Sequence, residues 1–563
     1  MTAQNPPLAG AGETHPLFNV GTELTDWNVF DSDAAMVDGL EREGAGWAQN
    51  QVRAHGECLG ESQVLEWGHL ANRYPPELDT HDRFGRRVDA VRYHPAYHEL
   101  MRLALENGLH SQPWLQPRPG AHVARAAMVS MQAQVEAGHG CPVTMTFASV
   151  PTLQMQPEVA GLFLDKVLTP GYQPDNVPYT QKRALTVGMG MTEKQGGSDV
   201  RANTTVAQPT GAAGPGQLYS ITGHKWFLSA PMCDVFLVLA QAPGGLSCFA
   251  LPRWLPDGSK NAMQVVRLKD KMGNRSNASS EVEFRGAQAW LIGEEGRGVP
   301  AIIEMVGLTR FDCMLGSAGQ MRMGVAQAIH HCQQRSAFGA LLTEQPLMQN
   351  VLADLALEYE AALAMSLRLG RALDARQAGD EQETKLFRLA TAVGKYWVCK
   401  RGPQHAYEIM ECIGGSGVME NSIFPRLFRE SVINPIWEGS GNVQCLDVLR
   451  ALAKDPQVLE VFRQELQRAR GAHAALDTHL QHLDRHWVSL AQADSHSLQW
   501  QARSLVEDMA LGLQAALLQQ SAPNAIADAF CEARLGDARR MQYGALPQGA
   551  AVELLLQRHD PSH

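Results

Sequence analysis

A single carboxylate stands between a tryptophan and two glycines in the stretch "NPIWEGSGNV", residues 434–443. Glu438 is the only charged residue there, and Gly439 and Gly441 let the backbone approach a ligand closely or take a positive φ. A carboxylate held against a ligand can act as a general base. The run Gly-Ser-Gly-Asn is also good turn and N-cap chemistry, which would make Glu438 a solvated acid. The spacing alone leaves both interpretations open.

Two earlier stretches combine small residues, hydroxyls and aromatic rings. "VGMGMTEKQGGSDVRANTT" includes residues 189–198, which can offer N–H and O–H donors to a polar, planar ligand. In "TGHKWFLSA", Trp226 and Phe227 stand beside Ser229, where a ring could cover such a ligand. Taken singly, a plain loop and a core strand are the simpler interpretations of these two stretches.

A third stretch, "RSAFGALLTEQ", lies between two helical segments. Arg335 suits a diphosphate, and Phe338 could cover an adenine ring. The alternative is a surface arginine beside a turn, because Gly339 follows directly.

Metal-ligating residues give a weaker pattern. The ten cysteines stand singly, without a CxxC pair. His482 and His486 have the i, i+4 spacing of a helical metal site, but no third ligand stands in a nearby motif. The sequence therefore predicts no metal site. Scattered thiols and an N-terminus without a signal-peptide pattern predict a cytoplasmic protein.

Composition restricts the class of protein. The chain has 563 residues, of which 45% are hydrophobic and 19% charged, as in a soluble protein of several domains. No uncharged apolar run is long enough to span a bilayer, so no membrane segment is expected. The net charge of −11 opposes a chain that coats nucleic acid through its overall field, although a local basic patch is still allowed.

Periodicity divides the chain into segments that position these residues. After a flexible tail (1–25), helical spacing dominates 26–181, as in "AHVARAAMVSMQAQVEAG". Short β-branched and aromatic runs, such as "DVFLVLAQA", predict an antiparallel β domain over 182–296. Long helical segments return over 297–455 as a bundle, and 456–563 adds a helical extension. The fold class predicted is α+β multidomain, with a site at the seam between the β domain and the bundle.

The joint occurrence of these motifs is more specific than any one of them. The series "MTEKQGGSD", "GHKWFLS", "RSAFGALLTEQ", "ECIGGSGV" and "IWEGSGN" resembles the acyl-CoA dehydrogenase superfamily. The runs "YPPELDTHDRFGRRVDAVRYHP", "RLKDKMGNRSNAS" and "LTRFDCMLGS" are similar to its AidB branch. The resemblance implies a helical domain, a β domain, a helical bundle and non-covalently bound FAD, with acyl-CoA as the substrate class.

The resemblance also implies roles for individual residues. In the β domain, it places beside the flavin Met189, Met191, Thr192, Ser198, Phe227, Leu228 and Ser229. Around Glu438, it places beside the cofactor Ile436, Trp437, Gly439, Ser440, Gly441 and Asn442. At the adenosine part of a neighbouring subunit's FAD, it places Arg335, Phe338, Gln345, Gly414, Gly415 and Gly417.

Glu438 matches the catalytic base of the straight-chain acyl-CoA dehydrogenases. Branched-chain enzymes take their base from a bundle helix, one residue before an arginine. That position is Thr309, before Arg310, so Glu438 has no rival. The resemblance thus predicts a general base that removes the α-proton of a thioester while hydride leaves to the flavin.

Partners follow from the same resemblance: a homotetramer, an acyl-CoA, and double-stranded DNA in the response to alkylation damage, with weak or vestigial dehydrogenase activity. The extension carries nine Arg, no Lys and twelve Asp or Glu, so it has no cationic excess. A local basic patch that binds phosphates could instead form from "KDKMGNRS" and "GKYWVCKRG", with Arg426, Arg429 and Arg450. The alternatives are an ordinary metabolic acyl-CoA dehydrogenase, and a flavin-stabilised DNA-binding protein whose Glu438 does no chemistry.

Overall fold

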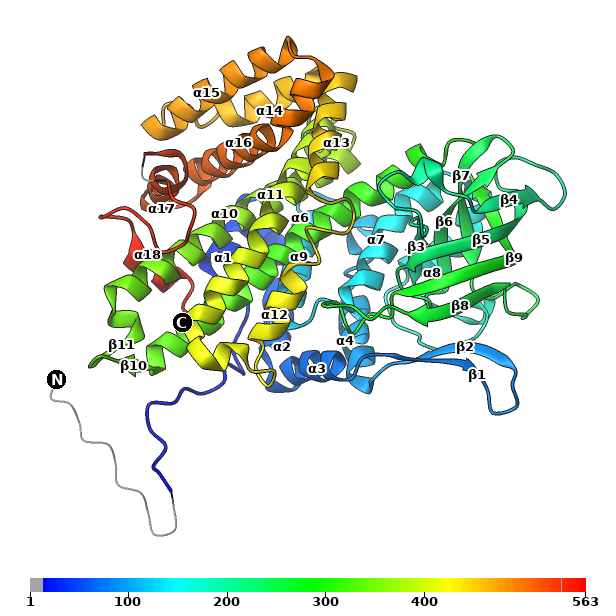
Figure 1. The fold of residues 1–563 in the computed structure, drawn as a ribbon, viewed down its shortest axis with the longest axis horizontal. Helices are drawn as coiled ribbons and strands as arrows, with labels where there is room; N and C mark the ends of the chain where they lie inside the picture. The colour runs from blue at the N-terminus through cyan, green and yellow to red at the C-terminus, as the bar shows by residue number, and fades with distance from the viewer. Residues whose placement is uncertain (1–13, 538, 563) are drawn as a thin grey trace.

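The computed structural model describes residues 14–537 and 539–562. Helices form one broad part of the molecule, and a β domain projects from its side (Figure 1). The chain passes through N-terminal helices, the β domain, long bundle helices and a last helical group. This order confirms the predicted α+β fold class.

The N-terminal part is mainly helical, and local chemistry marks where its helices begin. At the start of α4, His94 accepts a hydrogen bond from Ala96 N, and Pro95 takes the first position, where no backbone donor is needed. The helices are α1 (Ala34–Arg42), α2 (Gln49–Gly60), α3 (Ser62–Arg73), α4 (Pro95–Glu106), α5 (Gln112–Leu115), α6 (Ala121–Val135), α7 (Gly140–Gln154) and α8 (Pro157–Leu168).

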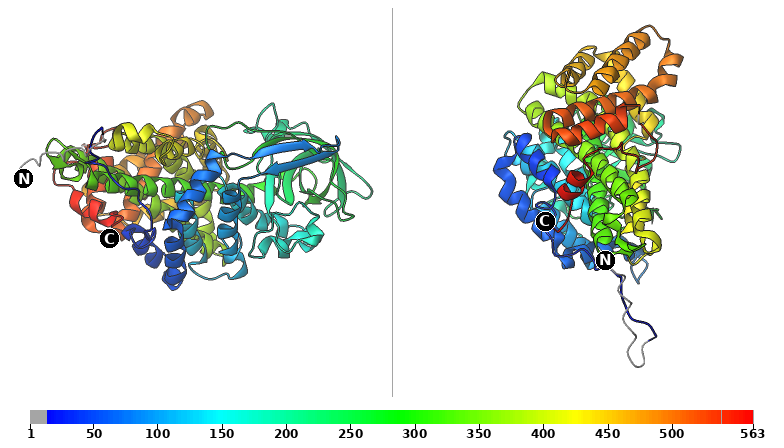
Figure 2. Two further views of the ribbon diagram at one scale, coloured as in Figure 1. Left: turned by 90° about the horizontal axis from the view of Figure 1, so that it is seen from below. Right: turned by 90° about the vertical axis from the view of Figure 1, so that its left-hand side faces the viewer.

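An antiparallel hairpin interrupts these helices, which the helical pattern over 26–181 did not predict. It consists of β1 (Glu77–His81) and β2 (Arg87–Arg92). Residues 75–76 are both proline and cannot continue α3. The Asp82 side chain then accepts backbone hydrogen bonds that make the turn. The hairpin reaches from the helical part to the β domain (Figure 2).

The β domain is a single seven-stranded sheet in which six strands follow the order β3-β6-β4-β5-β9-β7 and the seventh, β8, also pairs with β9. Because β6 pairs with β7 as well, the sheet closes on itself. Most pairs are antiparallel as predicted, but β3 and β4 both pair with β6 in parallel. β3 enters the sheet from the helical domain and not through a hairpin. The strands are β3 (Val187–Gly190), β4 (Val206–Pro209), β5 (Leu218–Leu228), β6 (Val235–Ala242), β7 (Gly245–Pro252), β8 (Met263–Leu268) and β9 (Ser280–Ile292), with the short turn η3 (Val200–Ala202).

Three long helices make the bundle, and α9 is central, because it packs against α6, α7, α10 and α11. Side chains on most of its circumference are therefore buried. The elements are α9 (Gly298–Gln334), β10 (Ser336–Ala337), β11 (Ala340–Leu341), η4 (Leu342–Glu344), α10 (Pro346–Gln377), α11 (Glu381–Ile413), η5 (Gly414–Val418), α12 (Phe424–Ser431) and α13 (Gly441–Lys454).

The C-terminal extension shares one hydrophobic core with the bundle, because α16 packs against α10, α11 and α13. Its elements are α14 (Gln457–Gln467), α15 (Ala474–Ala491), α16 (Ser495–Ser521), α17 (Asn524–Phe530), η6 (Cys531–Leu535) and α18 (Val552–Arg558). None of the described helices is both long and apolar enough to cross a bilayer.

The N-terminal tail expected over 1–25 falls partly outside the described residues. In its described part, Asn19 exchanges two hydrogen bonds with Ser336, at 2.8 and 2.7 Å. Thr22 N donates to Gln334 Oε1 at 2.8 Å. Asn19 and Thr22 therefore attach this segment to β10 and to the C-terminal end of α9.

Candidate active site

Glu438 lies in the loop between α12 and α13, in a backbone conformation that needs support. Its φ is +56°, a left-handed value that residues other than glycine seldom adopt. The carbonyls of Trp437 and Gly439 accept hydrogen bonds from Lys395 Nζ at 2.7 and 2.6 Å. The Glu438 carbonyl accepts one from Arg310 Nε at 2.9 Å. Two buried cations thus hold three successive carbonyls and fix the loop.

The Glu438 carboxylate points toward the bundle. Its Oε2 accepts a hydrogen bond from Thr309 Oγ1 at 2.7 Å. Burial raises the pKa of Glu438 above its ordinary value, and the Thr309 bond and the charges of Arg310 and Lys395 limit that rise. A partly buried carboxylate with a raised pKa and a single short hydrogen bond has the properties of a general base.

A further carboxylate keeps Arg310 in place. Asp447 on α13 accepts from Arg310 at 2.6 Å and from Arg388 at 2.7 Å. Gln444, one turn earlier on α13, donates to the Glu438 and Gly439 carbonyls at 3.0 and 2.9 Å. The loop is therefore tied to α9, α11 and α13 together.

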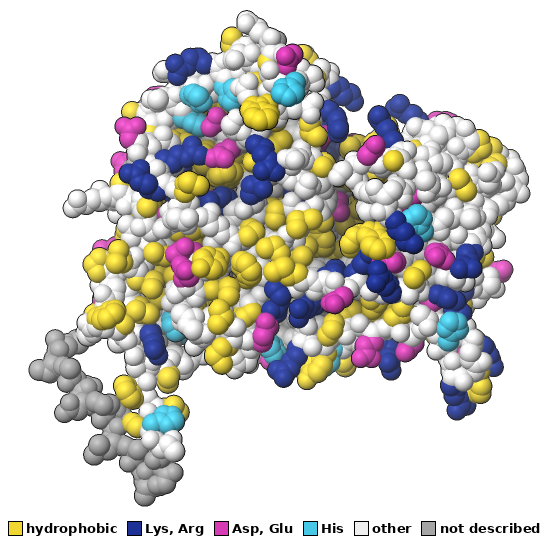
Figure 3. All heavy atoms as spheres, viewed as in Figure 1, with side chains coloured by type: hydrophobic (Ala, Val, Ile, Leu, Met, Phe, Trp, Pro, Cys, Tyr) yellow, Lys and Arg dark blue, Asp and Glu magenta, His cyan; other side chains and the backbone are white. Residues whose placement is uncertain are grey.

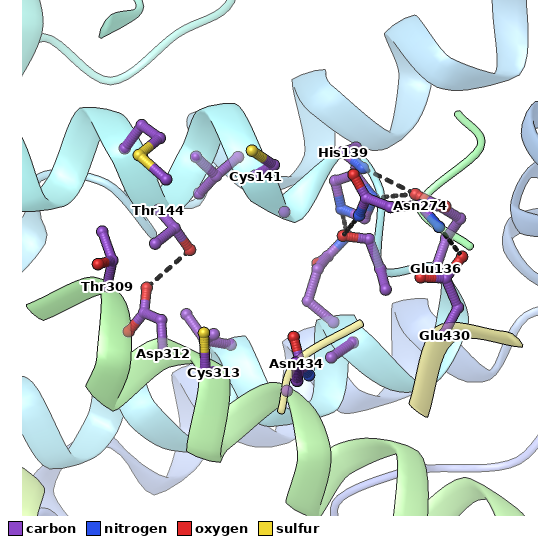
Figure 4. A pocket seen from close by; sticks show the side chains of 18 of the residues that line it. Glu136, His139, Cys141, Thr144, Asn274, Thr309, Asp312, Cys313, Glu430 and Asn434 are labelled. Atoms are coloured by element: carbon purple, nitrogen blue, oxygen red, sulfur yellow. Dashed lines mark hydrogen bonds and ion pairs between the residues drawn. The ribbon is translucent and has the colours of Figure 1, made fainter. Parts of the chain in front are cut away.

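Glu438 borders a cavity of about 80 Å³ between α6, α7 and α9. Thr309 and Asp312 line one end of it, and Glu136, His139, Asn274 and Glu430 line the other (Figure 4). The far end is polar and tightly bonded, since His139 Nδ1 lies 2.8 Å from Glu136 Oε2. Burial raises the pKa of Glu430 to about 7. The cavity therefore joins an apolar middle to an ionisable end.

The predicted flavin segments of the β domain lie side by side. Met189 N donates to Ser229 Oγ at 2.9 Å, and Ser229 N donates to Met189 O at 3.0 Å. The side chains of Met189 and Leu228 are buried in hydrophobic cores, so only their backbone could reach a cofactor. Phe227 is 44% exposed, and the ammonium of Lys269 lies 4.5 Å from its ring centroid.

The segment before η3 fits a ligand that accepts hydrogen bonds. Among the described residues, the hydroxyls of Thr192 and Ser198 have no hydrogen-bond partner. A Cβ on Gly197 would lie 2.4 Å from Thr192 Oγ1, so only glycine leaves that hydroxyl uncovered. Met191 lies in the same segment, between β3 and β4. These donors suit the edge of the FAD ring system and its diphosphate.

The predicted adenosine-side residues lie elsewhere, at the end of the bundle away from the β domain (Figure 1). Phe338 stands at the tip of the β10–β11 hairpin, fully exposed and with a φ of +53°. Arg335 donates to Asn19 O, and Gln345 Nε2 donates to Ala337 O at 2.9 Å. The hairpin therefore cannot share one FAD with the β domain of its own chain.

The glycine-rich loop after α11 is open on its surface. Gly414 and Gly415 are exposed, whereas Gly417 is buried. A Cβ at position 417 would lie 2.6 Å from Met410 O, so only glycine fits there. Glu411 hydrogen-bonds with Tyr407 just before this loop.

The remaining residues around Glu438 divide into exposed and bonded ones. Ile436 and Ser440 are exposed, and Trp437 Nε1 donates to Asn434 Oδ1 at 3.0 Å. Asn442 Oδ1 accepts a hydrogen bond from Arg503 Nε at 2.9 Å. Since Arg503 belongs to α16, the C-terminal extension contacts the start of α13 beside the candidate base, just after Gly441.

A hollow of about 780 Å³ separates η3 of the β domain from α9, α11 and α13. Lysine and arginine side chains border it on both sides (Figure 3). Its cationic lining residues are Arg201, Arg310, Arg376, Lys385, Arg388, Arg450 and Lys454. Five acidic residues line it as well, so seven cations leave a positive excess suited to a diphosphate or other phosphates.

Most of the residues predicted to form a surface basic patch have partners within the protein instead. Lys395 is buried and Arg426 is partly buried, and both donate to backbone carbonyls. Arg429 pairs with Glu420, and Lys269 pairs with Glu281. Backbone carbonyls and carboxylates therefore engage most of the charges that were to face a phosphate backbone, whereas Arg275, Lys400 and Arg450 are exposed.

Sequence reasoning missed Lys395, Gln444 and Arg503 as parts of the site. Lys395 carried a usable signal, since it stands inside the apolar run "LATAVGKYWVC", where a lysine must find acceptors when the helix is buried. The prediction of no metal site also rested on a missing third ligand. Asp508 supplies it, because His482, His486 and Asp508 bring one ligand atom each within 4.8 Å of one another.

Comparisons with known proteins follow the same division of the chain. Residues 188–287 match the acyl-CoA dehydrogenase middle domain, and residues 296–453 match the acyl-CoA dehydrogenase C-terminal domain. The structure of Caenorhabditis elegans ACDH-11 in complex with C11-CoA is 27% identical, with a TM-score of 0.85 over 96% of both chains. Acyl-CoA dehydrogenase family member 11 of that nematode is 31% identical over 73% of this chain and 68% of its own. The fold and the matched domains are therefore those of an FAD-dependent oxidoreductase of the acyl-CoA dehydrogenase type.

The N-terminal part narrows this class. Residues 19–174 match the N-terminal domain of the adaptive response protein AidB. AidB of Escherichia coli (strain K12) is 45% identical over 93% of this chain and 95% of its own. This chain belongs to the AidB family of acyl-CoA dehydrogenase-like proteins, as the sequence motifs predicted, and FAD is its cofactor.

Proposed function

We propose that this chain oxidises short acyl-CoA thioesters, with Glu438 as the general base. The observation that supports this proposal is the Glu438 carboxylate, held by Thr309 at the border of a cavity, with a raised pKa. Bound FAD supplies the acceptor for the β-hydrogen as hydride. Glu438 removes the α-proton, and its N–H, which has no acceptor among the described residues, is free to polarise the thioester carbonyl.

The cavity supports a short acyl group. Its volume of about 80 Å³ holds only a few heavy atoms. A long hydrocarbon chain would have to displace the bonded pair Glu136 and His139 and desolvate Glu430. The cationic hollow on the other side of Arg310 suits the diphosphate of CoA or of FAD.

Chain length is the direct test of this substrate class. In anaerobic single-turnover mixing, butanoyl-CoA should bleach the bound flavin about tenfold or more faster than palmitoyl-CoA, because the polar end of the cavity stops the longer chain. Loss of visible flavin absorbance is the measurement. Equal rates would remove the short-chain assignment, and bleaching by neither thioester would remove the proposed oxidation.

We also propose that the protein is a homotetramer in which one chain completes the FAD site of its neighbour. Phe338 and Leu347 are 101% and 84% exposed at the end of the bundle that lies away from the β domain. Hydrophobic side chains also gather on the helical half of the face in Figure 3. A large exposed apolar surface of this kind supports burial against another chain.

Replacing Phe338 by alanine should therefore weaken assembly and flavin retention together. Light scattering after gel filtration measures the mass, and the flavin-to-protein absorbance ratio measures the cofactor. Phe84→Ala is the matched control, because Phe84 is also an exposed ring (65%) at a hairpin turn, on the β1–β2 hairpin. A Phe338→Ala tetramer with full flavin, or an equal loss in both variants, would contradict the shared site.

A role in the response to alkylation damage, through binding of double-stranded DNA, is the third part of the proposal. The name of the matched N-terminal domain, adaptive response protein AidB, supports it. The cationic hollow offers exposed Arg201, Arg450 and Lys454 to phosphates. The same hollow suits CoA, so an ordinary metabolic acyl-CoA dehydrogenase is the alternative that the DNA measurement decides.

DNA binding through this hollow should be steep in salt and indifferent to sequence. Arg450→Gln should reduce the slope of log affinity against log salt by about one, since it removes one phosphate contact. Arg92→Gln, on an arginine that is 66% exposed and paired with Glu77, should leave the slope unchanged. Fluorescence anisotropy of a labelled duplex is the measurement. Undetectable binding at low salt would favour the metabolic alternative.

The cysteines support a reducing, cytoplasmic compartment for this function. All ten are free thiols, and nine of them are buried. Burial raises the pKa of the Cys141 thiol, which lines the cavity, to about 12, so it is not a competing nucleophile there.

A further inference from the structure

Three metal-ligating side chains meet on two neighbouring helices of the C-terminal extension, away from the candidate active site. His482 and His486 lie one turn apart on α15, and Asp508 faces them from α16. Each offers one ligand atom, and the three atoms lie within 4.8 Å of one another. Spacing along α15 accounts for the two histidines, and the packing of α15 on α16 brings the carboxylate.

The separations between the ligand atoms suit a shared ion better than direct hydrogen bonds. His482 Nε2 lies 3.5 Å and His486 Nδ1 lies 3.6 Å from Asp508 Oδ2. Both distances exceed the range of N–H···O hydrogen bonds. Ligands about 2.0–2.2 Å from a tetrahedral ion are about 3.3–3.5 Å apart from one another.

The surroundings leave these groups without a better partner. His486 Nδ1 is buried and has no hydrogen-bond partner in the described part of the chain. The nearby Asp484 pairs with Arg463, and Glu507 pairs with Arg539, so neither charge competes for the site.

A third histidine joins α15 to the backbone of Asp508 on α16. His479 stands one turn before His482, and its Nε2 lies 2.8 Å from the backbone carbonyl of Asp508. This contact fixes the position of α16 relative to α15 and so keeps the Asp508 side chain opposite the two ring nitrogens. Such supporting contacts are typical of metal sites.

We propose that His482, His486 and Asp508 bind a divalent transition-metal ion of the zinc class. Two imidazole nitrogens and one carboxylate oxygen favour such an ion over Ca²⁺ or Mg²⁺, which take oxygen ligands. His482 is 58% exposed, so the remaining coordination positions are open to water. The ion would join α15 to α16 and stabilise the folded extension.

The test is a Zn²⁺ titration of the full-length flavoprotein after chelator treatment and buffer exchange. Isothermal titration calorimetry should find one site per chain that His482→Ala weakens at least about tenfold. His496→Ala is the matched control, because His496 is an exposed histidine of the same extension that stacks on Trp500. Thermal unfolding is the second readout, since Zn²⁺ should raise the Tm of the wild type and of His496→Ala, but not of His482→Ala.

The subtraction between variants removes binding at cysteines, which both variants retain. Equal zinc affinity in wild type and His482→Ala would overturn the proposal. So would a Tm that does not rise with Zn²⁺ in the wild type, or an equal effect of the His482 and His496 substitutions. Flavin content should stay the same in all three proteins, because none of these residues contacts the FAD segments.

Discussion

Replacement of Glu438 by glutamine is expected to slow single-turnover flavin reduction by about 10² to 10⁴, with flavin still bound. Glutamine keeps the size of the side chain and can still accept the Thr309 hydrogen bond. It cannot accept the α-proton of the thioester. Stopped-flow absorbance of the flavin under anaerobic conditions measures the rate, and the flavin-to-protein ratio checks the cofactor.

The pH profile adds a readout that a merely structural role would not move. In the wild type the rate should rise with pH as Glu438 loses its proton, and burial places this rise above the usual glutamate range. That rise should vanish in Glu438→Gln. Glu460→Gln, on an exposed carboxylate of α14, is the control and should retain both rate and profile. A Glu438→Gln rate within a few-fold of the wild type would reduce Glu438 to a turn residue.

Replacement of Lys395 by methionine should damage both stability and rate. The Trp437 carbonyl would lose its donor and the Gly439 carbonyl would keep only Gln444, at a cost of about 1–3 kcal/mol in the free energy of unfolding. Freed from Lys395, the loop can relax its strained backbone and move the Glu438 carboxylate. Because a misplacement of about 1 Å can cost about 10²-fold in rate, flavin reduction should slow strongly in the folded variant.

Lys166→Met separates the two effects. Lys166 also donates to two backbone carbonyls, those of Tyr179 and Thr180, but it lies on α8 and outside the site. This variant should lose some stability in chemical denaturation and keep the wild-type rate of flavin reduction. If Lys395→Met reduced flavin as fast as Lys166→Met, the loop would not depend on Lys395 for its catalytic geometry.

The fold could be predicted largely from periodicity, because each segment repeats one local pattern. The helical spacing of 297–455 and the apolar run of β6 need no distant contact for their interpretation. The β1–β2 hairpin escaped because its strands are short and two prolines and one turn define it. The parallel pairing of β3 with β6 escaped because it depends on how two domains meet.

The sequence could predict which residue types form the candidate site, but not which residues contact them. Glu438 stood out because it is a lone carboxylate between a tryptophan and two glycines. Thr309 donates to its carboxylate and Lys395 to the neighbouring Gly439 carbonyl, and both are far away in sequence, so no spacing could reveal them. The same limit hid Asp508 from His482 and made buried lysines and arginines look like a surface patch.

We expect the flavin of this protein to oxidise an acyl-CoA with Glu438 as the base. The most direct measurement mixes the wild-type flavoprotein anaerobically with butanoyl-CoA and follows flavin absorbance and the thioester product, by mass spectrometry, in the same sample. If Glu438 and the flavin oxidise butanoyl-CoA together, the flavin should bleach and one enoyl-CoA should form per flavin reduced. Bleaching without enoyl-CoA, or a flavin that stays oxidised with this and every other short acyl-CoA, would contradict it.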